Sequence, residues 1–120
     1  MLLFTSEEKV AIMRLAMTMA GVDNDADKRE TALCLLLSAN LGMDESELDF
    51  AEALDFAPAT HIVSRMTIEE KTFVCSFIAK LITADGKTHP AELKLWTLMS
   101  SMCDFPLSFE EALSKFSDYV

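Results

Sequence analysis

Apolar residues recur along this chain at the three- and four-residue spacing of amphipathic helices. The clearest example is a broad apolar face with one residue every four positions, made of Phe73, Phe77 and Leu81. The strict alternation of apolar and polar positions that marks a half-buried strand occurs nowhere in the sequence. The pattern therefore predicts an all-α protein.

Four short motifs mark the starts of helices. Each places a Thr, Ser or Asp three residues before a Glu, which is the spacing of a capping box, in which the two side chains bind backbone N–H groups at a helix start. The pairs are Thr5 and Glu8, Asp44 and Glu47, Thr67 and Glu70, and Ser108 and Glu111. Further helices are predicted over 28–41, ended by Gly42, and over 90–102, begun by a proline. A short connecting helix is predicted over 58–65.

The chain repeats itself at a shift of 62 residues. Residues 5–43 share nine identities with residues 67–105, where chance would give about two or three. After a three-residue slip, residues 50–54 also match residues 109–113. We therefore predict one domain over 1–120, of about seven helices, built from a duplicated three-helix unit (about 5–54 and 67–116) with pseudo-twofold symmetry.

Charge narrows the choice of partners. Ten Lys and Arg stand against 20 Asp and Glu, so the formal net charge is −10. Most of this surface would repel DNA and anionic membranes, whereas a cation or a basic protein surface would complement it. No stretch reaches the roughly 18 apolar residues of a spanning helix, and the first residues lack the basic flank of a signal peptide. We expect a cytoplasmic protein that binds a protein partner or a second copy of itself.

An acidic turn lies between the first two helices of each copy. Both turns place an Asp at the end of one helix and a Glu in the first turn of the next. These residues are Asp23 and Glu30 in the first copy, and Asp85 and Glu92 in the second. Carboxylate oxygens are the ligands that Ca²⁺, Mg²⁺ and Mn²⁺ prefer, so the four residues are candidate metal ligands.

The second of these turns resembles a known family signature. The run ITADGKTHPAEL over residues 82–93, between two apolar helices, looks like the signature of the TerB-like (tellurite-resistance) family. The duplicated helical plan, which covers nearly the whole chain, is similar to that family's all-helical fold. In that family the motif's acidic residues are proposed metal ligands, so the resemblance implies a divalent cation at the acidic turns. The first copy departs from the pattern, with Asn24 in place of Gly86.

Helix capping explains the same carboxylates without a metal. If His89 is the N-cap of the helix that follows it, Glu92 stands at the third helical position and can accept a hydrogen bond from the N-cap amide. Asp27 and Glu30 have the same spacing in the first copy. The sequence leaves metal binding and capping both open.

Two classes of function fit these observations. The first is a non-enzymatic binding or scaffolding module, linked by the family resemblance to tellurite, metal or envelope stress. The absence of a nucleophile–base set, a phosphate-binding loop or an HExxH motif favours it. The alternative is a metal-dependent hydrolase that uses the clustered carboxylates to hold its metal.

Overall fold

The computed structural model describes residues 2–22 and 28–120, and it confirms an all-helical chain. The described residues contain seven α-helices, a closing 3₁₀ turn and no strand. The elements are α1 (Ser6–Ala20), α2 (Lys28–Leu41), α3 (Glu45–Ala53), α4 (Phe56–Ser64), α5 (Ile68–Thr83), α6 (Pro90–Cys103), α7 (Phe109–Lys115) and the 3₁₀ helix η1 (Phe116–Tyr119). None of the described helices is both long and apolar enough to cross a membrane.

The predicted helix ends agree closely with the observed ones. Helix α2 covers the predicted range, and α6 runs only one residue further than predicted, to Cys103. Helix α4 begins at Phe56 rather than at the predicted residue 58. Its Pro58 therefore stands at the third helical position, where the missing N–H would have had no partner within the helix.

All four predicted capping boxes are present. At the start of α5, the Thr67 hydroxyl accepts from the Glu70 amide at 3.1 Å, and the Thr67 amide donates to the Glu70 carboxylate at 2.9 Å. The boxes that begin α1, α3 and α7 have the same two bonds. Local sequence therefore sets where these four helices begin.

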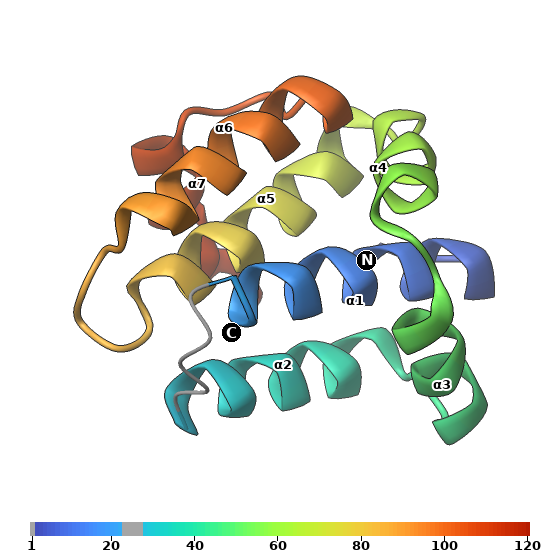
Figure 1. The fold of residues 1–120 in the computed structure, drawn as a ribbon. Helices are drawn as coiled ribbons and strands as arrows, with labels where there is room; N and C mark the ends of the chain where they lie inside the picture. The colour runs from blue at the N-terminus through green and yellow to red at the C-terminus, as the bar shows by residue number, and fades with distance from the viewer. Residues whose placement is uncertain (1, 23–27) are drawn as a thin grey trace.

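Helices α1 and α5 form the centre of the molecule (Figure 1). Helix α1 contacts α2, α3, α4 and α5, while α5 also contacts α2, α6, α7 and η1. The predicted apolar face of α5 is buried along its length, at Phe73, Phe77 and Leu81. Trp96 of α6 joins the same core and packs on the rings of Phe105 and Phe109.

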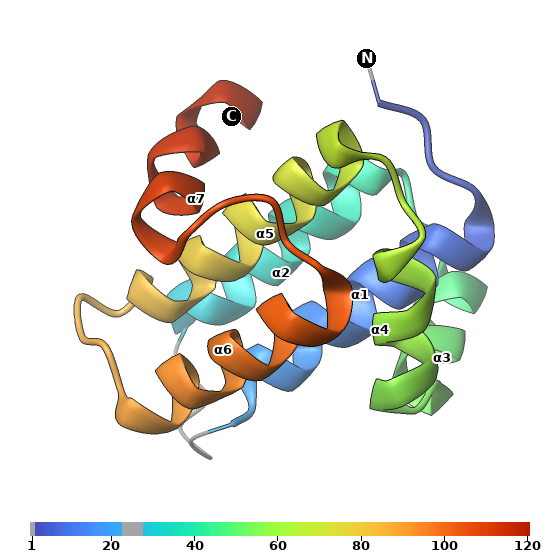
Figure 2. The same ribbon diagram turned by 90° about the horizontal axis from the view of Figure 1, so that it is seen from above.

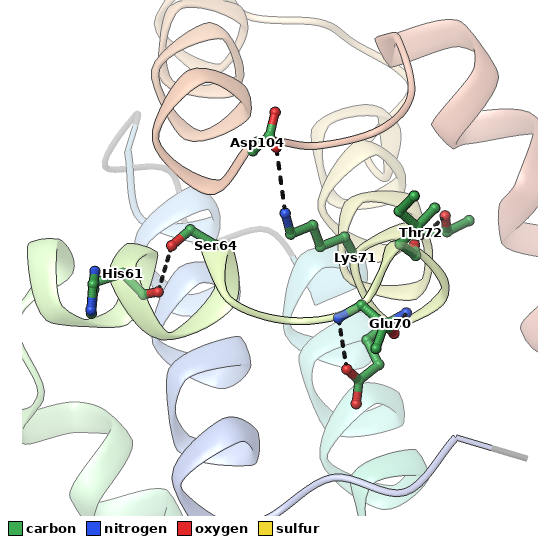
Figure 3. A network of polar contacts seen from close by, with 8 residues as sticks. His61, Ser64, Glu70, Lys71, Thr72 and Asp104 are labelled. Atoms are coloured by element: carbon green, nitrogen blue, oxygen red, sulfur yellow. Dashed lines mark hydrogen bonds and ion pairs between the residues drawn. The ribbon is translucent and has the colours of Figure 1, made fainter.

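A buried lysine ties the start of α5 to the end of α6. Lys71 is buried, and its Nζ lies 3.7 Å from Asp104 Oδ2 (Figure 3). Asp104 ends α6 in the left-handed conformation, with φ 57° and ψ 56°. Aspartate adopts this conformation more readily than most residues because its short side chain can hydrogen-bond locally. Neither the burial of the Lys71 side chain nor this cap was predicted from the sequence.

The third helices of the two halves are α3 and α7, and the sequence match between them is out of register with their first residues. The caps Asp44 and Ser108 place the first residues of α3 and α7 at 45 and 109, which are 64 positions apart. The matched segments 50–54 and 109–113 are 59 apart, so Phe50 lies in the middle of α3 whereas Phe109 begins α7. This match therefore places the same residue types at different helical positions.

Candidate functional site

Asp85 organises the turn between α5 and α6. Its Oδ1 accepts from the Lys87 amide at 2.9 Å, and its Oδ2 lies 3.2 Å from His89 Nε2. The bond from the Lys87 amide is the main cause that holds the pKa of Asp85 below its usual value, and the His89 ring acts in the same direction. Gly86 supplies the positive φ of 78° that the turn requires. Asp85 is thus engaged on both oxygens.

Glu92 caps helix α6, as one of the two sequence hypotheses predicted. It is 1 % exposed, and its Oε1 accepts from the His89 amide at 3.2 Å. His89 is the N-cap residue and precedes Pro90, which is the first residue of the helix. Capping therefore accounts for the position of Glu92 whether or not a cation binds there.

The turn of the first half is described only from Lys28 onward. Asp23 and Asp27, the predicted ligand and the predicted N-cap, lie outside the described residues. Glu30 lies in the first turn of α2 and is 2 % exposed. Burial, and then the charge of Glu30, raise the pKa of the Cys34 thiol to about 11.

A cation site at the turns stays a prediction. Among the described residues, no three His, Cys, Asp or Glu side chains lie close enough together to hold a metal ion. Asp85 and Glu92 do lie at the two ends of one turn, with His89 bonded to both. A cation there would need further ligands, of which Asp23 is the predicted one.

The cysteines are positioned as core residues rather than as ligands or nucleophiles. All three are free thiols, with Cys75 and Cys103 buried and Cys34 partly buried. Burial raises the pKa of Cys75 and of Cys103 to about 12. The thiolate is the reactive form of cysteine, so these groups are chemically quiet near neutral pH.

An apolar groove lies between α1 and α3. It encloses about 360 Å³ and is lined by Ser6, Glu7, Val10, Phe50, Ala53 and Leu54. Phe50 is 67 % exposed and adjoins the apolar side chains of Val10, Ala53 and Leu54 in the lining. Exposed carboxylates follow the same stretch of chain, at Asp49, Glu52 and Asp55, and Glu7 lies in the lining itself. The lining of the groove is therefore mainly apolar, with one carboxylate, that of Glu7.

Polar contacts at both ends of α3 join it to α1, beside the groove. The Ser6 hydroxyl donates to Glu47 Oε2 at 2.6 Å, and Glu47 also accepts from the Asp44 amide at 3.0 Å. These two bonds, with Ser6 first, hold the pKa of Glu47 below its usual value. At the other end of α3, the Arg14 guanidinium donates to the Glu52 carbonyl at 3.2 Å, where the last carbonyls of a helix lack partners.

The groove was missed by the sequence interpretation, although the sequence held a signal for it. The sequence from Asp44 to Asp55 is rich in carboxylates, a pattern typical of a solvated acidic face. The signal was the presence of Phe50 and Leu54, large apolar residues four positions apart, within that acidic run. Which of them would stay exposed depended on how α3 packs on α1, and the sequence did not show this.

Comparison with known proteins supports the fold and adds no activity. No protein-family model and no curated protein matches the chain. Among solved structures, it is similar to the crystal structure of a protein of unknown function from Porphyromonas gingivalis W83, with a TM-score of 0.81 and 25 % sequence identity. The similarity covers 98 % of this chain and 92 % of that chain. The same helical architecture therefore occurs in a second protein, over nearly its whole length.

Proposed function

We propose that this chain is a non-enzymatic binding module that recognises a basic, amphipathic segment of a partner protein through the groove between α1 and α3. The exposure of Phe50 in the lining of that groove carries the proposal, because aromatic side chains with apolar neighbours are enriched in protein interfaces. The Glu7 carboxylate in the lining and the net charge of −10 would attract a basic partner and repel an acidic one.

A binding assay with designed peptides tests this proposal. A labelled helical peptide with leucines on one face and lysines on the other is titrated with the protein, and its fluorescence anisotropy is measured. We expect Phe50→Ala to weaken binding at least about tenfold. The matched control is Ile68→Ala, which removes an equally exposed apolar side chain outside the groove lining. Equal losses for the two variants, or equal binding of a peptide with glutamates in place of the lysines, would refute the proposal.

We also propose that the chain is TerB-like and that its two halves arose by duplication. The residue 82–93 motif supports this, and so do the helix starts, since α1 and α5 begin 62 residues apart, as do α2 and α6. Superposition of the two halves provides the test. Helices α1 and α2 should superpose on α5 and α6 through a pseudo-twofold axis, while α3 and α7 follow less closely.

The predicted divalent cation is tested by thermal melting. Under the metal hypothesis, Ca²⁺, Mg²⁺ or Mn²⁺ raises the melting temperature relative to EDTA, because the ion binds only the folded form. Asp85→Asn and Glu92→Gln should then abolish the shift. The absence of any shift at millimolar metal would exclude a useful cation site and, with it, the alternative of a metal-dependent hydrolase.

A second copy of the chain is a separate candidate partner, favoured by the outer face of α2. Residues 31–43 form a run of 13 residues without a charged side chain, in a strongly acidic protein. Leu35 and Leu36 of this run are exposed. Like charges would oppose self-association elsewhere on the surface, so a dimer would form most readily here. Analytical ultracentrifugation of the wild type and of Leu35→Glu tests for this dimer. A dimer formed through α2 should dissociate in the variant, whereas one formed elsewhere should not.

A further inference from the structure

A second groove lies where the two ends of the described chain meet the start of α5. Figure 2 shows the N-terminal segment and the C-terminal turn on either side of that helix start. The groove is open to solvent and has a volume of about 730 Å³, enough for a small molecule. Its lining residues are Leu2, Phe4, Asn40, Glu69, Phe73, Asp118 and Tyr119.

Aromatic rings form one wall of this groove. The Phe73 ring is buried and packs against Phe4, at 5.5 Å between centroids, and edge-on against Tyr119, at 5.1 Å. Phe4 and Tyr119 are only partly buried, so both rings offer surface to the groove. The π-faces of aromatic rings carry negative potential and attract cations.

Two carboxylates stand beside the rings. Glu69 lies one helical turn before Phe73, and Asp118 directly precedes Tyr119. Burial is the main cause that raises the pKa of Tyr119, and the nearby Cys75 is the second. The charges of Asp118 and Glu69 also raise this pKa, so both act on the same hydroxyl. Glu69 and Asp118 line the same groove as the three aromatic rings.

Among the described residues, the lysines near the groove leave Glu69 and Asp118 accessible. Lys115 Nζ lies 4.0 Å from Asp118 Oδ2, but both side chains are more than half exposed, so water screens the pair and a ligand can displace it. Lys9 lines an adjoining hollow of about 310 Å³, which shares Leu2, Phe4 and Asn40 with the groove and has neither Glu69 nor Asp118 in its lining. A ligand cation is thus favoured at the Glu69 end.

We propose that this groove binds a small organic cation, with its ammonium or guanidinium group between Glu69 and Asp118 and its apolar part on the rings of Phe4, Phe73 and Tyr119. The same chemistry already occurs within the chain, where Lys80 Nζ lies 5.6 Å from the centroid of the Phe116 ring. Anionic ligands are excluded by the two carboxylates and by the net charge of −10. This site is independent of the groove that contains Phe50.

Two probes of similar shape separate the role of charge from that of apolar contact. The ring-proton signals of the single tyrosine are followed by NMR while the protein is titrated with 2-phenylethylammonium or with the neutral 2-phenylethanol. We expect the cation to shift the Tyr119 signals in a saturable way and to bind at least about tenfold more tightly than the alcohol. Equal binding of the two probes, or no saturable shift up to about 10 mM of the cation, would overturn the proposal.

Charge-removing variants locate the cation. Glu69→Gln combined with Asp118→Asn should reduce the affinity for 2-phenylethylammonium about tenfold or more. The matched control combines Glu110→Gln with Asp49→Asn, which removes two negative charges outside the groove lining. Glu110 is the second residue of α7, as Glu69 is the second residue of α5. An equal loss of affinity in both double variants would show that only the net charge matters, and it would overturn the proposed site. Binding of a lysine-rich peptide without binding of the free cation would overturn it as well.

Discussion

At the scale of the single residue, Glu92 is nearly inaccessible to solvent, and its hydrogen bond with the backbone gives it a structural role. Its Oε1 accepts from the His89 amide at the start of α6. Glu92→Gln keeps an acceptor oxygen in the same place, whereas Glu92→Leu leaves the amide without it. We expect Glu92→Leu to unfold at lower urea concentration than Glu92→Gln, by a difference of about 1 kcal/mol or more. Equal stability of the two variants would contradict the capping role.

The bond between Ser6 and Glu47 makes stability depend on pH. It is the first cause that lowers the pKa of the Glu47 carboxyl in the folded protein. A lowered folded pKa stabilises the folded state above the unfolded pKa, near 4.3, and this contribution is lost as the pH falls through the folded value. Ser6→Ala should therefore destabilise the protein more at pH 7 than at pH 3, as measured by urea unfolding.

A matched serine provides the control for this pH effect. Ser114 donates its hydroxyl to the backbone carbonyl of Glu111 at 2.7 Å, and that acceptor does not titrate. The effect of Ser114→Ala on stability should thus be similar at the two pH values. If Ser6→Ala also shows the same effect at both, its hydroxyl does not favour the ionised form of Glu47.

At the scale of the element, local signals fixed the helix starts and packing decided the rest. Thr67 and Glu70 could be recognised as a cap because both partners lie within four residues of each other. The contact of Lys71 with Asp104 joins residues 33 positions apart, from different helices, and no pattern in the sequence brings them together. The exposure of Phe50 was unpredictable for the same reason, since it depends on the contact between α3 and α1.

The same limit applies to the candidate sites. The sequence correctly placed Asp85 and Glu92 at the ends of one turn, because the spacing of a short turn is local information. The aromatic groove instead joins Phe4, Phe73 and Tyr119, which are brought together only by the packing of distant segments. Local chemistry was therefore predictable, whereas sites shared between elements were not.

The pair of Lys71 and Asp104 joins α5 to α6, and its energy can be measured with a double-mutant cycle. Asp104 is 91 % exposed at its side chain, so water screens the interaction strongly. We expect a coupling energy below about 1 kcal/mol between Lys71→Met and Asp104→Asn. Asp104→Asn should destabilise the protein slightly in the presence of Lys71, because the Lys71 ammonium loses its carboxylate partner, and should be nearly neutral once Lys71 is methionine. A coupling of several kcal/mol would contradict this.

At the scale of the whole molecule, the repeat in the sequence does not produce two separate bodies. Helix α1 of the first half packs on α5 of the second, and α2 also contacts α5. The connecting helix α4 packs on both α1 and α6. Buried residues of both halves belong to one continuous hydrophobic core. A half of the chain on its own would therefore expose an apolar face that the other half now covers.

This shared core predicts that the chain unfolds as a single unit. Leu15 of α1 and Ile78 of α5 are both fully buried in it. Leu15→Ala and Ile78→Ala each leave a cavity and should each destabilise the protein by about 2–5 kcal/mol. Because the halves share one core, each variant should lower the midpoint of one common transition, seen alike by Trp96 fluorescence and by far-UV circular dichroism. Trp96 belongs to α6, so it reports directly on the second half. If Leu15→Ala instead splits the transition and leaves the fluorescence midpoint unchanged, the two halves fold independently and the repeat is two domains rather than one.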